Sequence, residues 1–390
     1  MVLLRQVRIK RPKEEDRRIS QMLNKINEGS CVFYAPIGKV ISKKLPVFYN
    51  PDMKLNRDIC VLLLKSLPLE LRIADILAGT GIRSIRLLKE IPKARITSID
   101  INDLNPNAAK LIKKNLKLNK IKGKKISVQC KDANSFLIES NGFNYIDIDP
   151  FGSPNPFLDN SIRRLSREGL LAVTATDTSA LAGSHPGSCK RKYWATPLRN
   201  DMMHEIGIRI LIRKVQLIGA QYEKALMPIF CHSTLHYMRV YFACQKSKTA
   251  VDDVLKQHGY LLCCRKCMAR KTSQYNKDDC CKTAMEFAGP LWLGELWNRD
   301  IVDKMYKTVD TSNKELTRLI ITIRGECRIP AVGFYCISKL CKILKTMPPK
   351  QEILLKKIWQ KEADAAITHF MPDALRTSIK LEDLKRILRE

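Results

Sequence analysis

Strand-like and helix-like segments alternate through residues 72–174, and this alternation limits the fold more than any other feature of the chain. Five segments have the length and apolar content of strands: 72–77, 95–100, 125–130, 143–148 and 169–174. Apolar residues at helical spacing lie between them, in 82–90, 106–119 and 157–165. This order is typical of a doubly wound parallel sheet, so we predict an α/β fold with helices on both faces of the sheet.

The flanking segments indicate how the rest of the chain is organised. Segments 32–36 and 47–51 each end at a proline and predict a hairpin. A further helix is expected at 204–213 and a late strand at 235–243. The composition shifts toward Lys, Ser, Thr and Asp at 246–256, where we place a domain boundary before a smaller region that ends in a basic, mainly helical tail.

The charge balance indicates the class of partner. Lys and Arg total 69 against 39 Asp and Glu, which gives a net charge of +30. Such an excess favours a phosphate-rich partner over a membrane surface. Residues 1–20 lack the apolar core of a signal peptide, and the longest apolar runs are too short to cross a bilayer. We therefore expect a cytoplasmic protein whose 14 cysteines form no disulfide framework.

The first strand-to-helix turn carries Gly79 and Gly81, which would let the backbone approach a cofactor closely. The full dinucleotide motif is absent because residue 84 is Ser, so the turn alone is a weak signal. Two acids, Asp100 and Asp103, compete as the ribose-binding residue after the second strand. The alternative interpretation of Asp103 is a cap for the helix that starts near residue 106.

Residues 149–151, Asp-Pro-Phe, follow the fourth predicted strand directly. The carboxylate of Asp149 and the carbonyl of Pro150 can accept hydrogen bonds from an amine, and Phe151 can stack on a flat ring. Together these groups suit the exocyclic amino group of a nucleobase. The alternative is a turn that ends the strand and buries a core Phe.

Other candidate ligand-binding residues lie near the same predicted sheet edge. Asp132 ends the third strand and can accept from an adenine amino group, or it can simply cap a loop. Arg57 and Arg83 can each pair with a ligand carboxylate through two parallel hydrogen bonds. The alternative is that both are solvated, as most arginines are in a chain this basic.

The cysteines of the segment 263–281 form a candidate metal site. Cys264 and Cys267 have the spacing of one zinc knuckle. A second knuckle starting at Cys281 would need a thiolate three residues later, where the chain has Ala284. Cys280 is the candidate replacement for that thiolate, although two adjacent cysteines seldom bind one tetrahedral ion. Zinc binding and a zinc-free fold both stay open.

Several of these motifs, in this order, resemble the archaeal and eukaryotic tRNA guanine-N2 dimethyltransferases, which act on position 26 of tRNA. The resemblance extends over nearly the whole chain. Its most diagnostic run is Asp147-Ile148-Asp149-Pro150-Phe151-Gly152-Ser153-Pro154. It also includes the motifs 48–51, 56–58, 77–83, 102–103, 174–178, 204–205, 289–294 and 368–370.

The resemblance implies a Rossmann-like class I methyltransferase fold with S-adenosylmethionine as cofactor. It implies that Asp149, Pro150 and Phe151 hold the guanine. It also implies that the cofactor is bound by residues around the glycine turn: Arg57, Gly79, Gly81, Arg83, Asp103, Asp132 and Ala133. By the same resemblance the metal ligands are Cys264, Cys267 and Cys281, with Ala284 where a fourth Cys is expected.

The implied domain order is an N-terminal extension and hairpin at 1–60, which belongs to the catalytic domain, a methyltransferase domain at 61–248 and a tRNA-binding α+β domain at 249–390. The expected reaction adds one or two methyl groups to guanine N2 of tRNA, with no obligatory protein partner. A noncatalytic RNA-binding protein and a nicotinamide-dependent oxidoreductase are the competing interpretations. The oxidoreductase would favour a third glycine at Ser84, and a pure RNA binder would not need the run 149–151.

Overall fold

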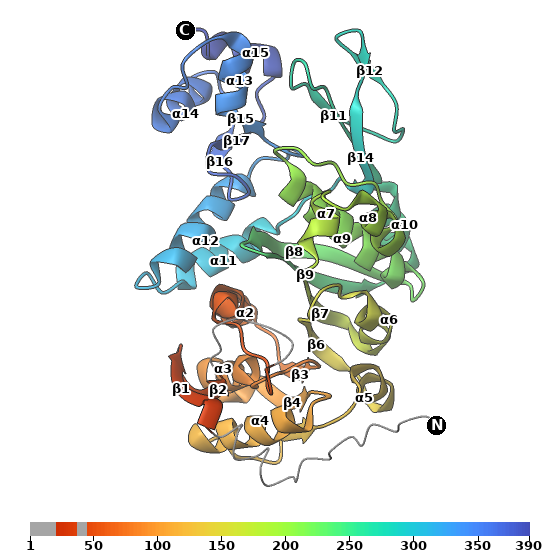
Figure 1. Cartoon of the computed structure of the whole chain (residues 1–390), viewed down its shortest axis with the longest axis vertical. Helices are drawn as coiled ribbons and strands as arrows, with labels where there is room; N and C mark the ends of the chain where they lie inside the picture. The colour runs from red at the N-terminus through yellow and green to blue at the C-terminus, as the bar shows by residue number, and fades with distance from the viewer. Residues whose placement is uncertain (1–20, 37–44) are drawn as a thin grey trace, which may run out of the picture.

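A seven-stranded sheet forms the centre of the protein in the computed structural model, which describes residues 21–36 and 45–390 (Figure 1). The strand order is β5-β4-β3-β6-β7-β9-β8. The strands are β3 (Leu71–Asp75), β4 (Ile96–Asn102), β5 (Ile126–Gln129), β6 (Phe143–Ile148), β7 (Leu165–Ala175), β8 (Lys224–Thr234) and β9 (Tyr237–Lys246). The first five run parallel, and β9 runs antiparallel to both β7 and β8.

Two groups of helices flank this sheet (Figure 1). One group is α2 (Lys54–Ser66), α3 (Ile82–Glu90) and α4 (Pro106–Leu118), and the other is α5 (Ala133–Glu139), α6 (Asn155–Arg164) and α9 (Met203–Ala220). Two short helices, α7 (Thr178–Leu181) and α8 (Pro186–Tyr193), precede α9. The predicted α/β class is confirmed. The strand order reverses between β3 and β6, which is where parallel sheets of this kind place their ligands.

Local sequence signals explain the elements that were predicted well. Asn105 caps α4 by accepting from the backbone N–H of Asn107, and Pro106 occupies the first turn. The predicted bounds of α3 and β6 are those observed. Strand β8 was missed because Pro228 interrupts its pattern; the pairing of β8 with β9 shifts register at that point.

The predicted hairpin between 32–36 and 47–51 is wrong. Strand β2 (Cys31–Pro36) pairs instead with β1 (Leu23–Glu28), whose mixed polar sequence gave no strand signal. Segment 47–50 contains no strand and leads into the short 3-10 helix η1 (Pro51–Met53). Residues 1–20 and 37–44 of the predicted extension and hairpin at 1–60 lie outside the described residues.

The chain after β9 forms the predicted smaller α+β part. Helix α10 (Lys248–Lys256) occupies most of the predicted boundary segment and packs against β8 and α9. Three small antiparallel sheets follow: β11 (Arg270–Ser273) with β10 (His258–Cys263) and β14 (Glu286–Trp292); β12 (Asp279–Cys280) with β13 (Thr283–Ala284); and β15 (Tyr335–Cys336) with β17 (Ala374–Thr377) and β16 (Ala365–Ile367).

Five helices accompany these small sheets: α11 (Arg299–Thr308), α12 (Lys314–Glu326), α13 (Ile337–Leu344), α14 (Gln351–Trp359) and α15 (Leu381–Ile387). Helices α11 and α12 pack against α2, so residues 299–326 of the smaller part contact the helix that precedes the first strand of the central sheet (Figure 1). Among the described residues, no helix is both long and apolar enough to cross a membrane.

A buried group of charges joins the smaller part to the central sheet. Arg376 of β17 is fully buried and donates to Glu205 Oε2 of α9 at 2.7 Å and to Glu326 Oε2 of α12 at 3.1 Å. Burial alone would raise the pKa of Glu205, but Arg376 and Arg209 lower it to about 2. At neutral pH these groups are therefore ionised and paired, and they fix α9, α12 and β17 to one another.

Candidate active site and cysteine cluster

A cavity opens where the strand order reverses, at the carboxyl ends of β3 and β6. Five parts of the chain line it: the loop and short helix 48–53, Arg57 of α2, residues of the turn after β3 from Asp75 to Arg83, Gly81 not among them, the run 149–151 with Thr176, and the tip of the β8–β9 hairpin, residues 235–237. Gly79, Arg83, Asp149, Pro150 and Phe151 thus surround one space, as expected for parallel strands whose ends meet at one edge.

The glycine turn is shaped for close approach of the backbone. Gly79 has φ +55°, and a Cβ there would lie 2.9 Å from the carbonyl oxygen of Phe48. The Gly79 N–H donates to Asp103 Oδ2 at 2.7 Å, so Asp103 fixes the turn from behind. Only glycine fits this position without strain, which leaves the cavity wall open to a bulky ligand.

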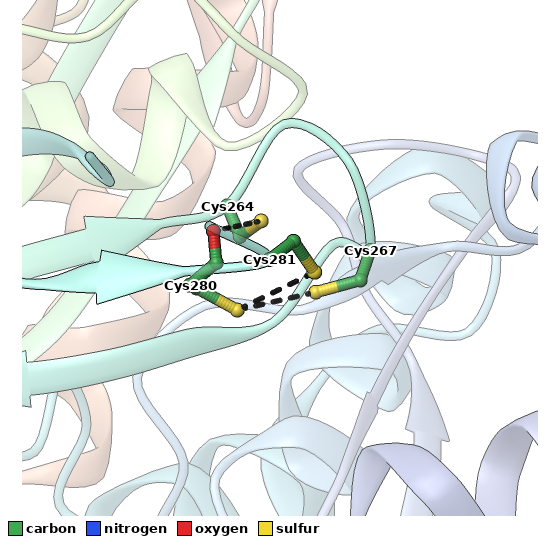
Figure 2. Close-up of side chains that lie close together, drawn as sticks. All are labelled: Cys264, Cys267, Cys280 and Cys281. Atoms are coloured by element: carbon green, nitrogen blue, oxygen red, sulfur yellow. Dashed lines mark hydrogen bonds between the residues drawn. The ribbon is translucent and has the colours of Figure 1, made fainter. Parts of the chain in front are cut away.

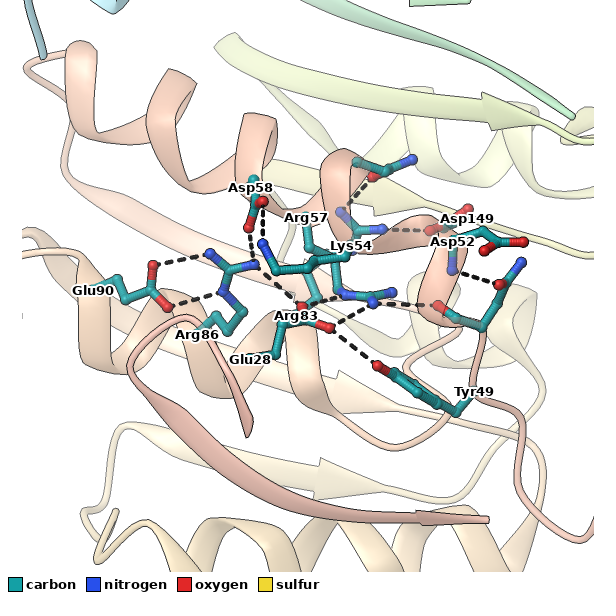
Figure 3. A network of polar contacts seen from close by, with 12 residues as sticks. Glu28, Tyr49, Asp52, Lys54, Arg57, Asp58, Arg83, Arg86, Glu90 and Asp149 are labelled. Carbon is teal, nitrogen blue, oxygen red and sulfur yellow. Dashed lines mark hydrogen bonds and ion pairs between the residues drawn. The ribbon is translucent and has the colours of Figure 1, made fainter. Parts of the chain in front are cut away.

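Asp149 is held by a buried arginine (Figure 3). Arg83 of α3 donates from Nη2 to Asp149 Oδ2, and from Nη1 to Asn56 Oδ1 at 2.9 Å. Its Nε lies 3.4 Å from Asp147 Oδ1. Burial would lower the pKa of Arg83, but Asp147 and Asp149 raise it well above its usual value. Arg83 is therefore a permanent cation that orients Asp149.

Asp147 has its own set of partners deeper in the sheet. Arg239 of β9 donates to its two carboxylate oxygens at 3.1 and 2.6 Å, and the Tyr145 hydroxyl donates at 2.6 Å. Burial would raise the pKa of Asp147, but Arg239 and Arg83 lower it. The sequence did not indicate Arg239, because its partner lies 92 residues away along the chain.

Pro150 and Phe151 complete the wall beside Asp149. The Thr176 hydroxyl accepts from the Gly152 N–H at 2.6 Å and lies 3.5 Å from the Pro150 carbonyl oxygen. The ring of Phe151, 43% exposed, meets the ring of Phe48 edge to face with centroids 3.9 Å apart. Phe151 is therefore not the core residue of the alternative interpretation; its ring lies at the cavity and is partly accessible to a ligand.

Arg57 lines the same cavity but already has an acidic partner. Its Nε and Nη2 donate to the two carboxylate oxygens of Glu28 at 2.6 and 2.7 Å (Figure 3). Glu28 ends β1 and also accepts from Arg86 at 3.2 Å and from the Tyr49 hydroxyl at 3.3 Å. The β1–β2 hairpin, which the sequence did not predict, therefore supplies the residue that holds Arg57 in place.

The other predicted ligand-binding residues lie outside the cavity lining; among them is Gly81, which has φ +76° and lies against Ile112 of α4. Asp103 contacts the lining only through Gly79 and also accepts from the Asn105 N–H at 2.9 Å. Asp132 caps α5 by accepting from the backbone N–H groups of Asn134 and Ser135, and Ala133 is buried in the first turn of that helix. Asp103, Asp132 and Ala133 lie at the ends of the neighbouring strands β4 and β5. The predicted roles of all four residues in cofactor binding stay predictions.

The four predicted cysteines form a second cluster (Figure 2). The sulfur atoms of Cys264, Cys267, Cys280 and Cys281 all lie within 4.8 Å of one another. Tetrahedral zinc with Zn–S bonds of about 2.3 Å separates its sulfur ligands by about 3.8 Å, so this donor set fits that ion. The two adjacent cysteines converge because Cys281 has φ +52° in the tight turn between β12 and β13.

The comparisons with known proteins agree with this architecture. The family model described as N2,N2-dimethylguanosine tRNA methyltransferase matches residues 29–389. The tRNA (guanine(26)-N(2)/guanine(27)-N(2))-dimethyltransferase of Aquifex aeolicus is 38% identical over 380 residues, which are 94% of this chain and 95% of that protein. The tRNA (guanine(26)-N(2))-dimethyltransferase of Methanobrevibacter smithii is also 38% identical, over 381 residues, 93% of this chain and 96% of that one.

A solved structure is similar over the same length. Trm1 from Pyrococcus horikoshii, in complex with S-adenosyl-L-methionine, superimposes with a TM-score of 0.84 at 34% identity and covers 94% of this chain and 100% of that one. The matched sheet, the cavity at its switch point and the relatives that match almost the whole chain all support the same family assignment. This chain belongs to the N2,N2-dimethylguanosine tRNA methyltransferase family.

Proposed function

We propose that this protein transfers one or two methyl groups from S-adenosylmethionine to the exocyclic N2 of guanine at position 26 of tRNA. The observation that carries the proposal is the placement of Asp149, Pro150 and Phe151 in one cavity with the glycine turn at the switch point of the sheet. The relatives described above match almost the whole chain and are named as tRNA guanine-N2 dimethyltransferases.

The cavity suits a ligand of mixed charge. When bound, S-adenosylmethionine supplies an electrophilic methyl group on a sulfonium centre. Gly79 and Gly81 would give the cofactor close access to the backbone, and Asp103 would hold that turn. Arg57 and Arg83 would provide positive charge for a carboxylate, and Asp132 and Ala133 would complete the site at the next strand end. Asp52 supplies negative charge in the cavity lining, whereas burial and the neighbouring Asp147 raise the pKa of Asp75, another lining residue, to about 7.

The residues of this chain would orient a weak nucleophile. The lone pair of guanine N2 is delocalised into the ring, so catalysis depends on alignment of N2 with the methyl group. Asp149 and the Pro150 carbonyl would each accept one N–H, and Phe151 would stack on the base. Asp149, held by Arg83, would take the proton once the nitrogen carries positive charge. One N–H remains for a second transfer.

Residues 249–390 would bind tRNA, in a protein that acts in the cytoplasm without an obligatory protein partner. The net charge of +30 favours binding to phosphates. Position 26 lies inside the folded tRNA, and extrusion of the base costs roughly a few kcal/mol. Phosphate contacts from both parts of the chain would offset that cost.

Nucleoside mass spectrometry of an unmodified tRNA transcript tests this proposal. After incubation with the protein and S-adenosylmethionine, we expect N2-methylguanosine or N2,N2-dimethylguanosine at position 26, and none in a transcript with adenine there. The same digest shows whether guanine 27 is also modified. Absence of both nucleosides, with tight binding of NADH instead, would favour the oxidoreductase interpretation.

We also propose that Cys280 supplies the fourth zinc thiolate, because Ala284 cannot. We expect one zinc per chain in the purified protein and a loss of zinc affinity of at least about tenfold in Cys280→Ser, since one of four ligands is removed. Metal analysis after dialysis against a chelator measures this. Cys130→Ser is the control, because Cys130 is exposed and lies outside the cluster. Equal zinc retention in the two variants would exclude Cys280 as a ligand.

A further inference from the structure

A second cleft adjoins the cavity of Asp149 at the tip of the β8–β9 hairpin. It encloses about 730 Å³ and is lined mainly by α12, by residues 233–235 of the hairpin and by residues 367–370 with Pro372. Ligand sites typically enclose about 300–1,000 Å³, so the cleft is large enough for a nucleotide. Leu235 lines both this cleft and the cavity of Asp149.

Leu235 occupies an unusual position for an apolar residue. It lies in the two-residue turn between the paired residues Thr234 and Tyr237, with φ +49° and 62% of its surface exposed. A branched apolar side chain is poorly suited to this backbone region, where Gly, Asn or Asp is usual. Strands β8 and β9 are long and paired, so they hold the turn in a fixed position. Leu235 therefore lies between the cavity of Asp149 and the second cleft.

The cleft itself carries groups that suit RNA. Lys314 and Arg318 lie one helical turn apart on α12 and line it, and neither forms an ion pair with a described residue. Two ring nitrogens of lining residues, His204 Nδ1 and His369 Nε2, are buried without a hydrogen-bond partner among the described residues. His369 Nδ1 is held by Glu326 Oε1 at 2.6 Å, which fixes the ring. The cleft thus offers cations for a phosphate, beside an imidazole ring of fixed orientation.

We propose that this cleft holds the nucleotide next to the target guanine in the substrate RNA, and that Leu235 enters the base stack in place of the extruded guanine. The inference rests on the proposed function and adds the residues that open the stack. Apolar side chains inserted between bases replace part of the stacking energy lost on extrusion. Lys314 and Arg318 would hold the backbone phosphate of the retained nucleotide.

The test compares Leu235→Ala with Ile321→Ala. Ile321 is 52% exposed on α12 and does not line the cleft, so it controls for loss of an exposed apolar side chain. The tRNA carries 2-aminopurine, whose fluorescence rises when it unstacks, at position 26, and no cofactor is added. We expect Leu235→Ala to lose most of the fluorescence gain and to lower kcat on unmodified tRNA at least about tenfold. Ile321→Ala should match the wild type in both.

A second pair of variants tests the phosphate contact. Arg318→Ala should raise KM for tRNA and reduce the salt dependence of binding by about one unit of slope. Lys307→Ala, which removes an exposed cation of α11 outside the cleft, should change neither quantity.

If the wild type methylates tRNA but Leu235→Ala behaves as Ile321→Ala, the proposed insertion of Leu235 into the base stack is wrong. If the wild type transfers no methyl group, the proposed function itself has failed.

Discussion

Asp149→Ala should abolish methyl transfer to tRNA while tRNA binding is retained. The substitution removes the acceptor that orients guanine N2 and leaves Arg83 without one of its carboxylate partners at the cavity. Loss of a group that orients the nucleophile and accepts its proton costs about 10²–10⁴-fold in rate. Binding should persist because phosphate contacts elsewhere supply most of the affinity. Transfer of a radiolabelled methyl group, measured beside a filter-binding assay, reports both quantities.

Two further variants make this result specific. Asp159→Ala removes an exposed carboxylate of α6 that contacts Tyr222 at 2.9 Å, and it should leave transfer unchanged. Asp149→Asn keeps one carbonyl acceptor but loses the charge, so it should retain more activity than Asp149→Ala. Full turnover by Asp149→Ala would refute the proposed role, and full turnover by Asp149→Asn alone would exclude Asp149 as the proton acceptor.

Arg376→Ala should lower the free energy of unfolding by about 3–5 kcal/mol, because it leaves two buried carboxylates without their common cation. Glu205 and Glu326 both bind Arg376, and all three side chains are at most 1% exposed. Urea unfolding followed by circular dichroism measures the change. Arg386→Ala is the control, since this guanidinium is 73% exposed and lies 3.5 Å from Asp383. The control should change stability by less than about 0.5 kcal/mol.

A further variant tests whether the destabilisation by Arg376→Ala comes from unpaired buried charge or from lost packing. A combined substitution of Glu205, Arg209, Glu326 and Arg376 by apolar residues of similar volume, which also removes the buried partner of Glu205, would be milder than Arg376→Ala if unpaired charge causes the loss. Equal destabilisation by the single and combined variants would instead assign the effect to lost packing.

Local signals in the sequence predicted the central sheet well. The bounds of α3 and β6 follow from apolar spacing and from the glycine turn, which are properties of neighbouring residues. The residues of the run 149–151 were found for the same reason: the run directly follows a strand. Their meeting with the glycine turn was also predictable, because parallel strands end at one edge.

The missed features depend on contacts between distant parts of the chain. Strand β1 has no apolar alternation and is stabilised by its pairing with β2 and by the contacts of Glu28 with Arg57 and Arg86. The convergence of Cys280 and Cys281 requires the left-handed turn that follows Cys280, which residue type alone does not indicate. The Leu235 tip was missed because β8 was not recognised as a strand.

The guanidinium between Asp147 and Asp149 has a consequence for how this chain can vary. Arg83 serves a carboxylate inside the sheet and another at the cavity, so neither acid can be exchanged without altering the charge balance of the other. Evolutionary drift at these three positions should therefore be correlated. A mutational library that varies them jointly would recover folded combinations that single-site scanning never samples.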